Sequence, residues 1–422
     1  MLHTELYQQV LGLAKPWWVS RVELSVAKQR VDVWVEHSRD VKWACPQCAS
    51  GESGSSGGRK RTRRLACRDH AEERSWRHLD TCQFRTYLHA RIPRVDCPEH
   101  GVVNVSVPWA EARSRFTLLM ESLIIEVLKE SATVTGACYL MGISWDQAFG
   151  VMERAVARGQ ARKEALPLSL VGVDEKAFRK GHSYMTIVCD IERSTVEHVA
   201  EDRKAESLAA YFESLGPERL AGIEAIAMDM WEPYVKATMA WVPLAADKIV
   251  FDRFHIMKHM NEAVDTVRLR EHRALMAEGR DILKGTKHWW LYGRENVPDK
   301  HRHAFEQVRD QNLRTSRAWA IKETLRDLWS YRSVAWAGKF FKDWYAWASR
   351  SALAPIKKVA RMVRSHLHNV LTYCKHPITN GVAEGLNSKI MAIKRRACGY
   401  RNKENFKTAI YFFCGGLDLT PR

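Results

Sequence analysis

Two aspartates in the middle of the 422-residue chain each follow a short apolar run, and this placement suits metal-dependent chemistry on phosphates. Asp174 follows residues 171–173, and Asp229 follows residues 223–228. Taken singly, each aspartate is a weak signal, because Asp often stops strands and caps helices. Two carboxylates that lie close together repel each other, whereas a bound Mg²⁺ removes the repulsion and keeps waters that a phosphate can replace.

The segments around these aspartates alternate between strand and helix patterns. Strands are predicted at residues 171–175, 184–190, 195–200, 223–228 and 249–251, and helices open at Asp202 and near Trp231, the first of them closed by Gly216-Pro217. An RNase H-like core has this order of elements: three strands, a helix, a strand, a helix and a strand. Because the first and fourth strands are neighbours in that order, we expect Asp174 and Asp229 to meet at one edge of the sheet.

A third carboxylate is expected from a helix late in the chain. Glu384 is the candidate, and Arg395 lies close to its line because a helix turns by about 100° per residue. Lys389, Lys394 and Arg396 lie beside this line. A solvated amphipathic helix is the simpler alternative. A basic run directly after an acid suits a phosphate-handling edge, so we expect these four basic residues to contact DNA.

Four segments carry a specific set of motifs: Val171-Gly172-Val173-Asp174-Glu175, Ala227-Met228-Asp229-Met230, Val250-Phe251-Asp252-Arg253-Phe254-His255, and the stretch from Asn380 to Asn402. Together they resemble the DDE transposases of bacterial insertion sequences, specifically the ISL-three family. The resemblance implies that Asp174, Asp229 and Glu384 bind the catalytic Mg²⁺ or Mn²⁺ ions. It also implies that Asp252-x-x-His255 is the D-x-x-H or C-x-x-H element of related transposases, so His255 is a further candidate catalytic residue.

The triad implies a mechanism. One metal ion activates a water for attack on the phosphodiester, and another stabilises the leaving 3′ oxygen. The freed 3′-OH then attacks target DNA, without a covalent protein-DNA intermediate. The expected partner is double-stranded DNA, both the terminal inverted repeats and the target. By the same resemblance, two element ends imply a homodimer or a higher homo-oligomer.

Cysteine and histidine pairs predict a zinc site near the N-terminus. Cys45-Pro46-Gln47-Cys48 and Cys97-Pro98-Glu99-His100 are two knuckle pairs that together offer four ligands for tetrahedral Zn²⁺. The ISL-three family likewise begins with a zinc-binding module. Cys67 and His70 also have ligand spacing. They could replace one pair, help to hold a second ion, or be an ordinary buried cysteine and a surface histidine.

A basic run follows a Gly/Ser-rich stretch between the two knuckle pairs. We predict that its Arg61, Arg63 and Arg64 contact DNA, and a solvated charge run is the equal alternative.

A helix-turn-helix is predicted after residue 116, where the apolar period becomes helical. A short helix ends at Gly142, and Ser144 with Gln147 three residues on forms a capping box that opens a second helix. Trp145 and Gln147 would then face a major groove. The alternative is an αα-hairpin that binds no nucleic acid.

The chain carries 66 Lys+Arg against 49 Asp+Glu, for a formal net charge of +17. Such a field favours a polyanion, with ribosome or membrane-surface binding as rivals on charge alone. The sequence has neither a long apolar run nor a signal-peptide core, so we expect no membrane segment and a cytoplasmic, nucleoid-associated bacterial protein. Ten cysteines without a secretory signal argue against a disulfide framework.

These observations predict a multidomain α/β protein. Its predicted parts are a zinc-binding domain at 1–110, a helix-turn-helix at 111–165, the first part of an RNase H-like core at 166–265, an all-helical, tryptophan-rich insertion at 266–375, and the last part of the core with Glu384 at 376–422.

The predicted function is that of a DDE transposase, which binds the terminal inverted repeats and catalyses metal-dependent strand cleavage and strand transfer. The main alternative is a catalytically inactive repressor or end-binding factor with the same fold. A structure-specific RNase H-like nuclease is a weaker option.

Overall fold

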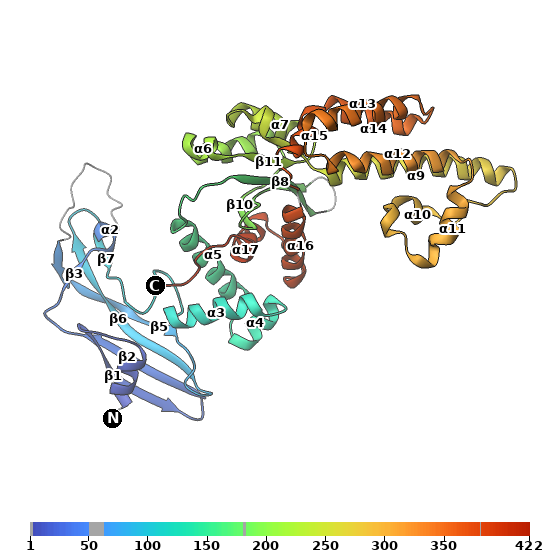
Figure 1. Ribbon diagram of the computed structural model, residues 1–422. Helices are drawn as coiled ribbons and strands as arrows, with labels where there is room; N and C mark the ends of the chain where they lie inside the picture. The colour runs from blue at the N-terminus through green and yellow to red at the C-terminus, as the bar shows by residue number, and fades with distance from the viewer. Residues whose placement is uncertain (1–2, 50–62, 180–182, 380) are drawn as a thin grey trace. The chain divides into compact units, whose positions relative to one another are not determined.

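The computed structural model describes residues 3–49, 63–179, 183–379 and 381–422 (Figure 1). Its packing divides the chain into two compact units. Unit 1 comprises Met1–Lys163, Arg395–Tyr400 and Leu417–Arg422, and unit 2 comprises Glu164–Lys394 and Arg401–Gly416. Two short C-terminal segments therefore pack with unit 1, whereas the sequence prediction assigned all of 376–422 to the core. The finer division into five domains stays a prediction.

Unit 1 contains a five-stranded sheet with the order β1-β2-β6-β5, and β7 pairs with the end of β6. The N-terminal elements are α1 His3–Val10, β1 Trp17–Ser25, β2 Arg30–His37, β3 Lys42–Ala44, α2 Pro46–Ala49, β4 Arg64–Ala66, β5 Asp69–Arg77, β6 Arg85–Cys97 and β7 Gly101–Asn104. The core of this sheet is rich in indole rings, and the ring of Trp109 lies edge-on against Trp17 and Trp76.

Three further helices of unit 1 confirm the predicted helix-turn-helix. They are α3 Leu118–Glu130, α4 Val134–Met141 and α5 Trp145–Ala161. Gly142 ends α4 with φ 60°, a left-handed conformation that glycine adopts without strain. Ser144 Oγ accepts from the Gln147 amide at 3.2 Å, and Gln147 Oε1 accepts from the Ser144 amide at 2.9 Å. The capping box therefore forms as the sequence predicts.

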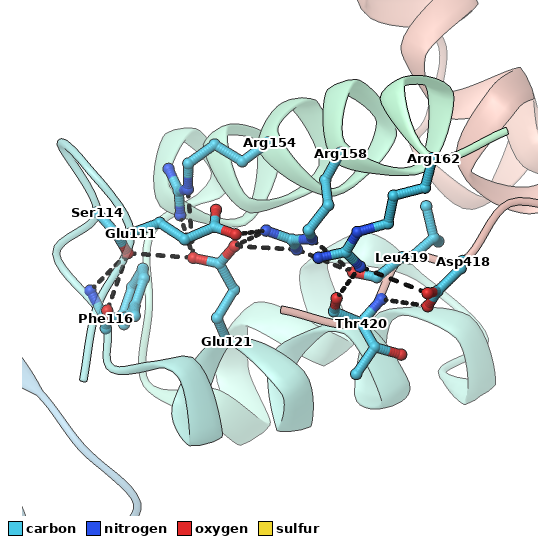
Figure 2. Close-up of polar contacts among 10 residues, drawn as sticks. All are labelled: Glu111, Ser114, Phe116, Glu121, Arg154, Arg158, Arg162, Asp418, Leu419 and Thr420. Carbon is cyan, nitrogen blue, oxygen red and sulfur yellow. Dashed lines mark hydrogen bonds and ion pairs between the residues drawn. The ribbon is translucent and has the colours of Figure 1, made fainter. Parts of the chain in front are cut away.

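A buried ion-pair network holds α3 and α5 together (Figure 2). Glu121, only 1% exposed, accepts from Arg154 Nη2 at 2.6 Å and from Arg158 Nη2 at 3.4 Å. Arg158 also pairs with Glu111 and donates to the carbonyl of Leu419 at 2.8 Å. The C-terminal segment of unit 1 is thus fixed to α5 by the same arginine that neutralises Glu121.

Unit 2 is built on a five-stranded sheet with the order β10-β9-β8-β11-β12. Its strands are β8 Leu170–Arg179, β9 Ser183–Asp190, β10 Thr195–Ala200, β11 Ala225–Met228 and β12 Ile249–Phe251. The first three form an antiparallel meander, while β11 runs parallel to both β8 and β12. Strand order matches the sequence prediction, including the contact between the first and fourth strands. The predicted end of the first strand at Glu175 is wrong, because β8 pairs with β9 as far as Arg179 and Asp174 lies within it.

Helices cover both faces of this sheet, with α6 and α7 on one side and α16 and α17 on the other (Figure 1). The helices of unit 2 are α6 Ala205–Gly222, α7 Glu232–Trp241, α8 Ala245–Lys248, α9 Arg253–Ala277, α10 Lys287–Leu291, α11 Asp299–Arg309, α12 Arg314–Arg326, α13 Val334–Arg350, α14 Ala354–Ser365, α15 Leu367–Leu371, α16 Gly381–Arg396 (within unit 2 to Lys394) and α17 Lys403–Cys414. Short 3₁₀ turns lie at Arg294–Asn296, Asp327–Ser330 and Thr372–Cys374.

The predicted end of the first core helix at Gly216-Pro217 is confirmed, because Gly216 is non-helical with φ 73°. The sequence did not predict the short second helical segment of α6, which continues from Pro217 to Gly222. Proline lacks only an N–H that the first turn of a helix leaves unpaired, so Pro217 opens the second segment instead of ending the element.

The region from Arg253 to Thr379 contains no strand, as the sequence predicts. Long helices α9 and α12 lie side by side within it (Figure 1). Four of its tryptophans are buried, namely Trp290, Trp319, Trp329 and Trp344. They confirm the prediction that most of these rings form core. Trp336 and Trp347 are exposed. Among the described residues, no helix is long and apolar enough to span a membrane.

Candidate active site and zinc cluster

Strand register brings three aspartates to the same level of the unit 2 sheet. Gly172 of β8 pairs with Ala227 of β11, so Asp174, inside β8, and Asp229, just past the end of β11, lie at the same level of neighbouring strands. Met228 pairs with Phe251 of β12, which places Asp252 beside Asp229 in the same way. The carboxyl ends of parallel strands share one edge, and this edge is acidic.

Local hydrogen bonds fix the direction of these carboxylates. The backbone amide of Glu175 donates to Asp174 Oδ1 at 2.7 Å, and the amide of Trp231 donates to Asp229 Oδ1 at 3.1 Å. Asp252 is 4% exposed and caps α9 by accepting from the Phe254 amide at 3.3 Å. Each carboxylate keeps one oxygen outside these local bonds.

Helix α16 adds two side chains to this edge. Glu384 is half-buried in its first turn. Asn387, one turn later, donates from Nδ2 to Asp174 Oδ2 at 2.6 Å. Asn387 follows Glu384 by three residues, and no role was predicted for it. The signal that could have revealed one is this i, i+3 spacing on a single face.

The acidic edge perturbs the charges of its members. Burial raises the pKa of Asp174 to about 6, and it also raises the pKa of Asp229. Burial and then repulsion from Asp252 raise the pKa of Glu384. His255 lies with Nδ1 3.2 Å from Asp252 Oδ2, and this contact raises its pKa. A cation at this edge would favour the ionised carboxylates and so oppose the effect of their burial.

The donor set fits a hard divalent cation, because Asp174, Asp229 and Glu384 offer only carboxylate oxygens. Asn387 Oδ1 is buried and has no hydrogen-bond partner among the described residues, which leaves one more oxygen at the same place. The carboxylate oxygens of these three acids are not all within 4.8 Å of one another, since within the described residues only a cysteine and histidine group meets that spacing. Metal binding would draw the three acids closer.

That group is the predicted zinc site, formed by Cys45, Cys48, Cys97 and His100. The sulfur of Cys48 lies 3.7 Å from that of Cys97, and His100 Nδ1 lies 3.6 Å from the sulfurs of Cys45 and Cys97. Thiolate ligands about 2.3 Å from a tetrahedral ion are about 3.7 Å apart, so the spacing fits Zn²⁺. The turn between β6 and β7 presents the second pair, and Gly101 closes it with φ 66°.

Cys67 and His70 lie outside the four-residue zinc cluster. The Cys67 thiol contacts the Asp69 carbonyl at 3.2 Å, and His70 Nε2 lies 2.8 Å from His37 Nε2. They therefore replace neither knuckle pair.

The predicted DNA-contacting residues of the helix-turn-helix have partners within unit 1. Trp145 stacks on Phe149 with ring centroids 5.4 Å apart, and the amide oxygen of Gln147 is occupied by the capping box. The Gln147 amide nitrogen is the part of that side chain that the box does not use.

The basic residues of α16 divide into two kinds. Lys394 donates to the Phe178 carbonyl at 2.6 Å, and Arg396 donates to the carbonyls of Leu128 and Lys129, both at 3.0 Å, at the end of α3. Lys389 and Arg395 are exposed. Of the basic run near the zinc knuckles, Arg61 lies outside the described residues, whereas Arg63 and Arg64 are exposed.

The strand order, the acidic edge and the helix-turn-helix together define a nucleic-acid-processing protein, and comparison with known proteins narrows this class. Residues 171–410 match the DDE model of the ISL3 family, described as a transposase. Residues 105–156 match the helix-turn-helix domain of transposase family ISL3, and residues 42–100 match the zinc finger of the transposases of IS204, IS1001, IS1096 and IS1165.

Two curated relatives extend over most of the chain. The transposase for insertion sequence element IS1001 of Bordetella parapertussis is 29% identical over 335 residues, 78% of this chain and 82% of the relative. The transposase for insertion sequence element IS1557 of Mycobacterium tuberculosis is 26% identical over 356 residues, 78% of this chain and 79% of the relative. The chain therefore belongs to the ISL3 family of transposases, as its motifs predicted. It acts in DNA transposition and binds DNA through its helix-turn-helix.

Proposed function

We propose that unit 2 is an RNase H-like catalytic core that cleaves and rejoins DNA at the ends of an insertion sequence. Asp174, Asp229 and Glu384 would hold Mg²⁺ or Mn²⁺. The observation that carries the proposal is the register of β8, β11 and β12, which brings two of these acids and Asp252 to one sheet edge beside the helix that bears Glu384. When bound, such ions activate a water and stabilise a leaving 3′ oxygen.

The chain's own residues prepare this edge in two ways. Asn387 donates to Asp174 and so holds one carboxylate oxygen in a fixed direction. Asp252 raises the pKa of His255, so that the imidazole carries positive charge closer to neutral pH and offsets repulsion among Asp174, Asp229 and Glu384. We assign His255 and Asn387 as positioning residues for the three acids.

We further propose that unit 1 recognises the terminal inverted repeats. The Gln147 amide nitrogen and the half-buried Trp145 would meet bases, because the first turn of the second helix enters the groove in a helix-turn-helix. Arg63, Arg64, Lys389 and Arg395 are exposed and suit phosphate contacts, whereas Lys394 and Arg396 already serve backbone carbonyls. The zinc cluster would hold its knuckles rigid.

Two element ends require two active sites, so we propose that the working form is a homodimer or a larger homo-oligomer at bacterial DNA. We propose that each predicted domain has its own role: zinc binding at 1–110, DNA recognition by the helix-turn-helix at 111–165, and catalysis by the core at 166–265 and 376–422, with the helical insertion at 266–375.

The test is a cleavage and strand-transfer assay on labelled DNA that carries the element's own ends, in Mg²⁺. The Glu384→Gln variant is expected to bind these ends like the wild type and to cut none of them. Glu213, an exposed acid of α6, provides the matched control, because Glu213→Gln leaves the acidic edge intact. Equal cutting by wild type and Glu384→Gln would remove Glu384 from the metal site.

One observation favours a second candidate, a DNA-binding factor without catalysis. The three acids do not gather within 4.8 Å of one another, so they do not form a single closed ligand shell around one ion. Tight binding of the element ends with no nicking in Mg²⁺ or Mn²⁺ would select this candidate.

A further inference from the structure

A cavity of about 820 Å³ opens next to the acidic edge of unit 2. Its wall comes from three places in the sequence: Tyr184 on β9, the turn after β10 with Arg203, and Trp231 with Lys236 at the start of α7. Lys403 of α17 lines its rim. The proposed metal-binding role of Asp174, Asp229 and Glu384 does not involve this cavity.

Three side chains form a layered surface in the cavity. The guanidinium carbon of Arg203 lies 4.4 Å from the ring centre of Tyr184 and 4.7 Å from that of Trp231. Trp231 Nε1 donates to the Arg203 carbonyl at 3.2 Å, and Arg203 Nη1 lies 3.4 Å from Glu175 Oε2. These contacts hold the Arg203 side chain in a fixed position before any ligand binds. Aromatic rings and guanidinium planes stack on flat ligands such as nucleobases.

The charges around the cavity argue against a site made for a bare phosphate. Its four cationic side chains, Arg203, Lys204, Lys236 and Lys403, face four acidic ones: Glu201, Asp202, Glu206 and Glu232. Lys236 lies 3.7 Å from Glu232, and Lys204 lies 3.9 Å from Asp202. Because the charge is balanced and the wall is aromatic, the cavity suits the flat, uncharged part of a nucleotide, its base.

The cavity is joined to the acidic edge through adjacent residues. Trp231, in the cavity wall, donates its backbone amide to Asp229 Oδ1. Glu175, the partner of Arg203, follows Asp174 within β8 and faces the opposite side of the sheet, because successive strand residues alternate. A nucleotide in the cavity would therefore lie beside Asp229, at one end of the acidic edge. Bases in duplex DNA are covered by their stack, so only an unpaired or extruded base could enter.

We propose that this cavity binds one unpaired nucleobase next to the cleaved phosphodiester, stacked on the layer of Tyr184, Arg203 and Trp231. The inference rests on the proposed function, since it takes the acids to be the place of cleavage. A volume of about 820 Å³ lies within the range of roughly 300–1,000 Å³ that is usual for small-molecule sites.

The first experiment uses wild-type protein without Mg²⁺, so that no chemistry intervenes. A short single-stranded DNA with one 5-iododeoxyuridine is irradiated on the protein, and the cross-linked peptide is mapped by mass spectrometry. We expect cross-links at Trp231 or Tyr184. Cross-links confined to other peptides would overturn the proposal.

The second experiment measures stacking with the same DNA carrying one 2-aminopurine, whose fluorescence falls when it stacks on an aromatic ring. Trp231→Ala is expected to remove the quenching and to weaken binding by about tenfold or more, the usual effect of losing one stacking ring. Trp231→Phe should restore most of both. Trp241→Ala is the matched control, because Trp241 is 38% exposed at the other end of the same helix.

The outcomes separate this proposal from the proposed function. If Trp231→Ala loses the 2-aminopurine quenching but the wild type cleaves no DNA in Mg²⁺, the base-binding cavity is supported and the catalytic assignment is refuted. If the wild type cleaves DNA but quenching is equal in wild type, Trp231→Ala and Trp241→Ala, base binding in the cavity is refuted and the catalytic assignment is supported.

Discussion

Replacing Asp174 by asparagine is expected to stabilise the metal-free protein. Burial raises the pKa of Asp174 from 3.8 to about 6, so the ionised carboxylate is held at a cost in the folded state. At about 1.36 kcal/mol per pKa unit, the difference corresponds to about 3 kcal/mol at neutral pH. Asparagine carries no charge and can keep the hydrogen bond from the Glu175 amide, so Asp174→Asn recovers most of this free energy.

The difference in the free energy of unfolding between wild type and Asp174→Asn should depend on pH in a defined direction. Because the folded pKa lies above the unfolded one, the folded wild type holds a proton between pH 4 and 6 that the unfolded chain has lost. The wild type therefore gains stability as pH falls through about 6, and Asp174→Asn lacks this gain. The gap between the two proteins should shrink from about 3 kcal/mol at pH 8 to roughly 1.5 kcal/mol at pH 5.

The assay is urea unfolding of both proteins at pH 5 and pH 8, after dialysis against magnesium-free buffer. Asp343, an exposed carboxylate on α13, provides the control, and Asp343→Asn should follow the wild type at both pH values. Addition of Mg²⁺ should stabilise the wild type and leave Asp174→Asn unchanged, because ligand stabilisation requires a site in the folded state. A gap that is zero, or that grows toward pH 5, would refute the reasoning.

Three further predictions concern unit 1. Cys97→Ser should lose the bound zinc, measured by mass spectrometry of the intact protein, and unit 1 should then unfold at a lower temperature, since structural zinc contributes folding free energy directly. Glu121→Leu leaves Arg154 and Arg158 without their buried partner and should lower the free energy of unfolding by about 3–5 kcal/mol in chemical denaturation; an unchanged midpoint would mean that the network contributes nothing. Burial lowers the pKa of His78 to about 4, so the unfolded chain takes up a proton between about pH 6.5 and 4 that the folded protein does not bind. The free energy of unfolding of the wild type should therefore decrease as pH falls through this range. His78→Gln should show a smaller decrease, and the same pH dependence in both proteins would contradict the prediction.

Local sequence patterns were sufficient to predict most of the elements. Alternating apolar residues gave the strands of unit 2, and the Ser144 and Gln147 pair gave the start of α5, because both signals act within a few residues. The knuckle pairs also predicted the zinc ligands, since each pair is rigid on its own turn. Gly216-Pro217 correctly marked a helix end but gave no sign of the segment that Pro217 opens, because the same dipeptide can end one helix and begin the next.

The sequence by itself determined the types and spacing of the reactive groups: the two aspartates that follow apolar runs, the acid on the late helix, and the two knuckle pairs. Tertiary structure alone decided how these groups are supported. It brought Asn387 to Asp174 across 213 residues, and it placed Arg203 between two aromatic rings. It also placed Arg396 against backbone carbonyls at the end of α3, while its DNA contact stays a prediction. These contacts depend on strand register and helix packing between distant segments, which no local pattern encodes.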